Sequence, residues 1–78
     1  MYNKTQTKEA LKINEEVLND WLRLNEMSLA EICKDQEIKC DPGNVSKMLR
    51  GEIPTPKHIM EKFLRRTRIS HKILLDFS

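Results

Sequence analysis

Polar side chains recur every three residues in a short segment near the middle of the chain. Residues 41 to 56 are Asp-Pro-Gly-Asn-Val-Ser-Lys-Met-Leu-Arg-Gly-Glu-Ile-Pro-Thr-Pro, so Asn44, Lys47 and Arg50 would share one side of a helix. Amide and ammonium groups can hydrogen-bond the edges of nucleobases, and a guanidinium at a helix end suits a phosphate. The alternatives are that Asn44 caps the helix and that the two cations are ordinary solvated residues. The spacing therefore predicts a helix with one side directed to a nucleic acid.

Apolar residues define the opposite side of this helix. Val45, Met48 and Leu49 follow each other at threes and fours, as on the buried stripe of an amphipathic helix. Gly51 can adopt the left-handed conformation that ends a helix, and the prolines that follow favour an extended connection. We expect a helix over residues 44–51, short enough to enter a DNA major groove and held to its neighbour by its apolar side.

The preceding residues predict two helices that would position this segment. Apolar residues at helical spacing from about residue 8 to residue 25 predict a long first helix, with Trp21 in the core and its N-terminal part projecting beyond it. Ser28 followed by Glu31 is a capping box, which begins a second helix that ends near Gln36. A turn then leads to Gly43.

Two more helices are expected after the prolines. Thr55 is placed to cap a helix with Pro56 at its first position, and Ser70 to cap a last short helix that ends near Phe77. The exposed side of the fourth helix is basic, and we interpret it as a solvated face that aids nonspecific attraction to nucleic acid. Its cations are Lys62, Arg65, Arg66 and Arg68.

The composition favours an all-α fold. The chain has 78 residues, with two glycines and few aromatic residues, and it lacks an alternating Val/Ile/Thr run. A chain of this size buries only about 60% of its unfolded surface and has one modest core. We expect a flexible N-terminus over residues 1–8 and a single domain over residues 9–78.

Charge and cysteine content limit the classes of function. Residues 1–41 carry six Lys/Arg and nine Asp/Glu, whereas residues 42–78 carry eight and three, so the positive charge lies in the second half. Cys33, Cys40 and the isolated histidines have no metal-ligand spacing, and we expect neither metal nor cofactor nor disulfide. A phosphate-binding loop or a nucleophile with its base is not evident, so an enzyme is not expected. Without an apolar run of membrane-spanning length or a signal peptide, we expect a cytoplasmic protein.

Three parts of the sequence together resemble the Cro and phage-repressor family of helix-turn-helix domains, also called XRE-like. They are Ser-Leu-Ala-Glu-Ile-Cys at 28–33, Asn-Val-Ser-Lys-Met-Leu-Arg-Gly at 44–51 followed by Pro54, and Ile-Ser-His-Lys-Ile-Leu-Leu at 69–75. The resemblance covers residues 13 to about 77. It implies a compact five-helix domain, here with an extended first helix, in which the second and third helices form the helix-turn-helix and the third enters the major groove.

The resemblance also implies roles for individual residues. Cys33 becomes the small residue where the two helices cross, and Val45 the apolar pin of the recognition helix. Base contacts fall on Gly43, Asn44 and Lys47, and contacts to the DNA backbone on Ser28, Ser46 and Arg50. The interval from Cys33 to Val45 is about two residues longer than is usual in the family, and Pro42 and Gly43 stand where it commonly has long polar side chains.

From these residues we expect a sequence-specific, repressor-type transcriptional regulator of bacterial, phage or other mobile-element origin. Its partner would be a double-stranded DNA operator, bound by a pair of chains that associate weakly without DNA. The alternative is a protein-binding module on the same fold, such as an antirepressor or an inhibitor of another regulator or host protein, because a fold does not fix a function.

Overall fold

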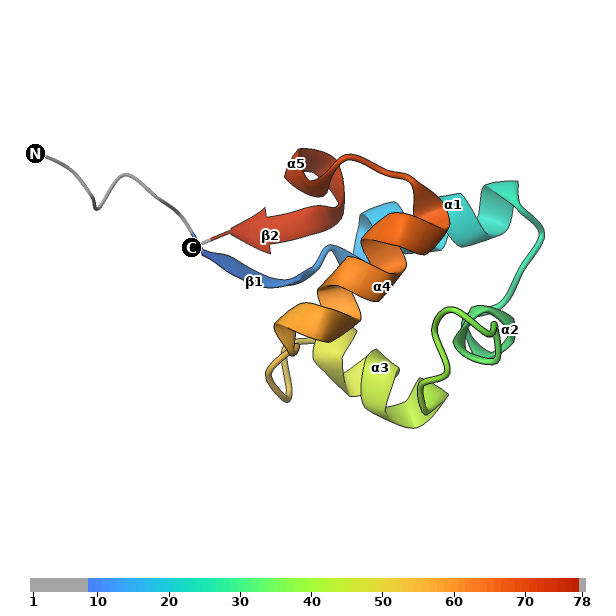
Figure 1. The fold of residues 1–78 in the computed structure, drawn as a ribbon, viewed down its shortest axis with the longest axis horizontal. Coiled ribbons are helices and arrows are strands. Elements are labelled where there is room, and N and C mark those ends of the chain that lie inside the picture. The colour runs from blue at the N-terminus through green and yellow to red at the C-terminus, as the bar shows by residue number, and fades with distance from the viewer. Residues whose placement is uncertain (1–8, 78) are drawn as a thin grey trace, which may run out of the picture.

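The structure, a computed structural model, describes residues 9–77. Residues 1–8, expected to form a flexible N-terminus, and residue 78 lie outside the described residues. Within residues 9–77, five helices and two short strands follow one another, arranged as in Figure 1. In order they are β1 (Ala10–Ile13), α1 (Glu15–Leu24), α2 (Leu29–Cys33), α3 (Pro42–Leu49), α4 (Lys57–Thr67), α5 (His71–Leu74) and β2 (Leu75–Phe77).

The prediction of an all-α fold with an extended first helix is wrong. β1 and β2 form a two-stranded antiparallel sheet in which Ile13 pairs with Leu75 and Lys12 with Asp76, with an irregularity between residues 10 and 12. The paired Ile13 and Leu75 side chains are buried, so Ile13, which the prediction places on a projecting helix, belongs to the core through a strand. The domain is mostly helical with a small sheet that joins its two ends.

A cap explains why the first helix starts late. Asn14 has an extended backbone, and its side-chain oxygen accepts a hydrogen bond from the Val17 amide at 3.0 Å. An N-cap residue of this kind separates the strand before it from the helix after it. α1 therefore begins at Glu15, and the helix predicted from about residue 8 is divided into β1 and α1.

One hydrophobic core holds the elements together. Phe63 of α4 is fully buried and shares a cluster with side chains from every other helix and both strands. The largest buried members are Phe63, Ile13, Leu18, Ile32, Ile38, Leu74, Val45 and Cys33. Ile38 comes from the turn between α2 and α3, so this turn is anchored to the same core as the helices that it connects.

The last two helices also differ from their predicted bounds. Pro56, not Thr55, stands at the N-cap of α4, and the buried Thr55 hydroxyl makes no hydrogen bond within residues 9–77. α5 is capped by Ser70 as predicted, but it ends at Leu74 because the next three residues pair with β1. Among the described helices, none has the length and apolar character needed to cross a membrane.

Candidate nucleic-acid interface

The capping box at the start of α2 is confirmed. The Ser28 amide donates to Glu31 Oε1 at 2.7 Å, and the Glu31 amide donates to Ser28 Oγ at 3.1 Å. Both groups satisfy backbone donors that a helix start would otherwise leave free. Ser28 is exposed, as its predicted role in contacting a DNA backbone requires.

α3 begins two residues before its predicted start. Asp41 is its N-cap and accepts from the Asn44 amide through Oδ2 at 2.9 Å, with Pro42 at the first helical position. Acid followed by proline is a known signal for a helix start, so this boundary was available in the sequence. Asn44 is therefore not the cap: it lies in the first turn, and its side chain is exposed.

Gly43 has a local structural reason to be glycine. A Cβ atom built on it would lie 3.0 Å from Oδ2 of Asp41, the oxygen that caps the helix. This spacing is tighter than an ordinary van der Waals contact, so a larger residue would press on the cap. Gly43 is also exposed, so no side chain covers the backbone of the first turn of α3 at this position.

The two sides of α3 differ as predicted. Val45 and Leu49 are 1% and 3% exposed and belong to the core, and Met48 is half-buried against it. Asn44 and Lys47 are exposed on the remaining surface, and the Lys47 ammonium forms no hydrogen bond or ion pair with a residue in the range 9–77. The exposed helix side thus presents amide and ammonium groups, together with the backbone at Gly43, at the surface.

The side chains of Arg50 and Ser46, by contrast, form hydrogen bonds with groups of the same chain. The Arg50 guanidinium pairs with Glu52, Nε to Oε2 at 2.7 Å, and also donates to the Ser46 hydroxyl. The hydrogen bond that Arg50 donates to Glu52 is the largest cause that lowers the pKa of the Glu52 carboxyl. Both side chains of the ion pair remain about half exposed, so Arg50 lies at the surface with its charge balanced by a neighbour.

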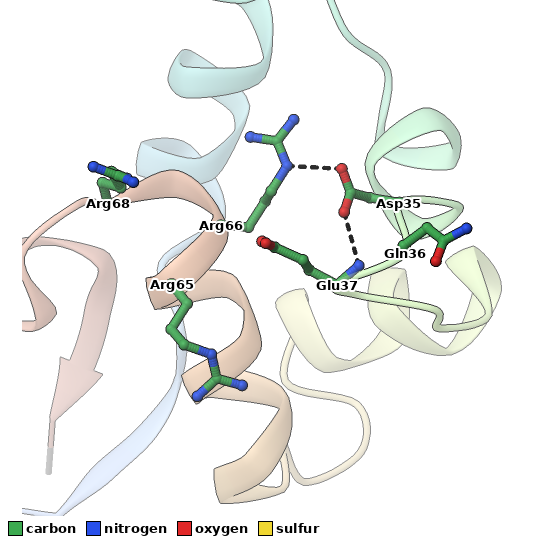
Figure 2. Close-up of a pocket in the computed structure, with 6 residues that line it drawn as sticks. All are labelled: Asp35, Gln36, Glu37, Arg65, Arg66 and Arg68. Carbon is green, nitrogen blue, oxygen red and sulfur yellow. Dashed lines mark hydrogen bonds and ion pairs between the residues drawn. The ribbon is translucent and has the colours of Figure 1, made fainter.

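The interpretation of the basic side of α4 as a solvated face holds for Arg65 and Arg68, which are exposed, but not for Lys62 and Arg66. Lys62 Nζ donates to the Ile38 carbonyl at 3.1 Å. Arg66 Nε pairs with Asp35 Oδ2 at 2.8 Å, as Figure 2 shows. The Arg66 guanidinium also lies 5.3 Å from the centre of the half-buried Trp21 ring. These two cations hold the α2–α3 turn to α4 and are half-buried.

An open hollow between this turn and α4 has mixed charge. It is lined by Asp35, Gln36, Glu37, Arg65, Arg66 and Arg68, and Figure 2 shows the Arg66 side chain reaching across to Asp35. The hydrogen bond from Arg66 is the largest cause that lowers the pKa of Asp35, followed by the one from the Glu37 amide at 2.8 Å. Of the charged groups that line it, Asp35 and Arg66 form an ion pair within the described residues, and this pair joins the turn to α4.

Neither cysteine lies in a metal-binding cluster. Within the part of the chain that the structure describes, no three side chains of His, Cys, Asp or Glu are grouped to hold a metal ion. Cys33 is a buried free thiol, and burial raises its pKa to about 11. It packs in the core where α2 approaches α3.

In comparisons with protein-family models, curated proteins and solved structures, no match to the chain was found.

Proposed function

We propose that this protein is a sequence-specific DNA-binding regulator of transcription, repressor-type and of bacterial, phage or other mobile-element origin, whose α3 enters the major groove. The observation that carries the proposal is the division of α3 between buried Val45 and Leu49 on one side and exposed Asn44 and Lys47 on the other. An amphipathic helix held in this way presents its polar side at a width that the major groove accepts. The resemblance of residues 13 to 77 to the Cro and phage-repressor family supports the same function.

The proposed contacts follow from the side chains. Asn44 and Lys47 would hydrogen-bond base edges, and Gly43 would let the backbone come close to them. Ser28 at the α2 N-terminus would contact a phosphate. Ser46 and Arg50 would do so only after Arg50 leaves Glu52, so their contribution depends on an exchange of partners. The chemistry needs no cofactor and no catalytic step.

A short helix contacts few base pairs, so a pair of chains on two half-sites is proposed. Half-sites that lie one helical turn apart place two such helices on one side of the duplex. Association that is weak alone and strengthened on the operator fits a domain of this size. The bound protein would then block or recruit the polymerase.

Selection of bound sequences from random duplex DNA, using the purified full chain, tests this function. We expect enrichment of a motif with two related half-sites, and affinity that falls steeply with salt because phosphate contacts release counterions. Selection that returns no enriched motif, together with binding that salt does not weaken, would contradict the proposal.

A second candidate is a protein-binding module on the same fold. Leu24, Leu11 and Ile73 are large apolar side chains that are 81%, 55% and 59% exposed, and the first half of the chain is acidic. Exposed apolar side chains can take part in contacts with another protein. In this case affinity for a regulatory partner would change little between low and high salt, which separates the two candidates in one titration.

A further inference from the structure

A lysine from the sheet lies at the C-terminal end of α3. Lys12 of β1 donates from Nζ to the Leu49 carbonyl at 2.9 Å, across 37 positions of sequence. The last carbonyls of a helix lack partners within the helix and carry partial negative charge, which a cation stabilises. Because β1 lies against α3, Lys12 acts as a side-chain cap supplied by another element.

The same ammonium is held in place by the other strand. Lys12 Nζ lies 3.2 Å from Oδ2 of Asp76, its cross-strand partner, and the two side chains are 28% and 37% exposed. Oδ1 of Asp76 accepts from Asn14 Nδ2 at 2.9 Å. Asn14 is the cap of α1, so each oxygen of one carboxylate connects to a different helix end.

The end of α3 has no other long-range support of this kind in the described chain. Arg50, at the C-cap, turns its guanidinium to Glu52 and Ser46, both within four residues. The backbone bonds at this end are also local: the Arg50, Gly51 and Glu52 amides donate to Ser46, Met48 and Lys47 carbonyls. Lys12 is thus the group that ties this end of the helix to the sheet.

We propose that Lys12 and Asp76 are positioning residues that fix the C-terminal end of α3, and thereby the orientation of Asn44 and Lys47 toward bases. The proposal rests on the function proposed above for its effect on DNA, although its structural part does not depend on DNA. Lys12 would contact neither base nor phosphate. It would instead preserve the difference in affinity between the operator and other DNA.

Substitutions at the two positions separate this role from a direct phosphate contact. Lys12→Met should lower the ratio of operator to nonspecific affinity by roughly threefold to tenfold, as expected for loss of a charge-assisted cap, and leave the salt dependence of binding unchanged. Asp76→Asn should lower the same ratio, because Lys12 loses its anchor. If Lys12 instead contacted a phosphate, Asp76→Asn would free it and strengthen all DNA binding, and Lys12→Met would reduce the salt slope by about one.

A measurement without DNA keeps the two proposals distinguishable. In Lys12→Met, amide hydrogen exchange at Arg50, Gly51 and Glu52 should accelerate roughly threefold to tenfold relative to the Ile32 amide of α2. Lys72→Met is the matched control: this exposed lysine of α5 has no side-chain partner in residues 9–77, and its removal should change neither ratio. Unchanged relative exchange in Lys12→Met would overturn the inference even if DNA binding is established, whereas accelerated exchange in a chain that binds no DNA would overturn only the proposed function.

Discussion

α3 and α4 are both amphipathic and both carry cations, but the structure uses these cations in different ways. Lys47 on α3 is exposed and unpaired within residues 9–77. Lys62 and Arg66 on α4 are half-buried and engage the turn between α2 and α3. Positive charge at helical spacing is therefore not sufficient to identify a nucleic-acid surface. What distinguishes Lys47 from Lys62 and Arg66 is whether a carbonyl or a carboxylate of the same chain lies within reach.

The turn explains why α4 supplies these cations. Residues 34–41 form no regular helix or strand and include Lys39 with φ of 47°, in the left-handed region. Carbonyl groups in such a segment need partners other than those of a helix or a sheet. Lys62 provides one to Ile38, and Arg66 fixes Asp35. The long turn between α2 and α3 is thus held by α4.

Removing the two exposed groups of α3 together should have the largest effect. In the double variant Asn44→Ala/Lys47→Ala, operator affinity should fall by about a hundredfold, because each base contact contributes roughly 1–3 kcal/mol. The melting temperature should change little, since neither side chain is buried. Fluorescence anisotropy with labelled operator measures the first and circular dichroism the second. Lys72→Ala, which removes one exposed charge elsewhere, is the control for net charge, and operator affinity retained in the double variant would remove α3 as the contact surface.

Removing Arg66 should affect stability. Arg66→Ala loses the ion pair with Asp35 and the contact with Trp21, so the melting temperature should fall by roughly 5–10 °C. Arg65→Ala is a matched control one residue away, since Arg65 is exposed and forms no ion pair in the described region. It should leave the melting temperature within about 2 °C. Equal decreases in melting temperature for Arg66→Ala and Arg65→Ala would mean that the contacts of Arg66 with Asp35 and Trp21 do not stabilise the fold.

The features that could be predicted from the sequence are those that depend on residues close together in the chain. The start of α2 followed from the local pair Ser28 and Glu31, and the buried side of α3 from the spacing of Val45 and Leu49. Local chemistry specifies such features because the interacting groups are within a turn of each other. The start of α3 was missed although Asp41-Pro42 is also a local signal.

Other features depended on residues distant in the sequence. Ala10–Ile13 becomes a strand only because Leu75–Phe77 lies beside it, and alternation over four residues is too short a signal to identify it. Lys62 and Arg66 could not be separated from Arg65 and Arg68 by spacing, because a long side chain can turn to solvent or to a neighbour. The partners of the first two, Ile38 and Asp35, were placed by the fold.

Glu52 offers a way to alter the use of an α3 cation. In Glu52→Gln the carboxylate that pairs with Arg50 is neutralised, so the guanidinium becomes available for a phosphate. DNA affinity should increase by about twofold to fivefold, and the salt slope should become steeper by about one. Measurement of affinity at several salt concentrations in wild type, Glu52→Gln and Glu52→Gln/Arg50→Ala tests this. The single variant Arg50→Ala completes the comparison: Glu52→Gln should bring no gain in affinity when it is added to Arg50→Ala, whereas an equal gain there would reflect only the loss of one negative charge.

The smallest expected effect concerns acid and the pair of Asp35 with Arg66. The guanidinium holds the pKa of this carboxyl below its usual range in the folded chain, so the unfolded chain binds more protons as the pH falls. The stability that the pair contributes is therefore present above about pH 4, the ordinary range of an aspartate, and is lost as the pH falls through the lowered value. The difference in melting temperature between wild type and Arg66→Ala should accordingly be constant from pH 5 to pH 7 and narrow below about pH 4.

Because the contact with Trp21 does not titrate, part of the difference in melting temperature should persist in acid. The part that persists measures how much of the stabilisation by Arg66 comes from the Trp21 ring. A difference that stays constant down to about pH 2 would assign the whole effect to the ring and none to Asp35.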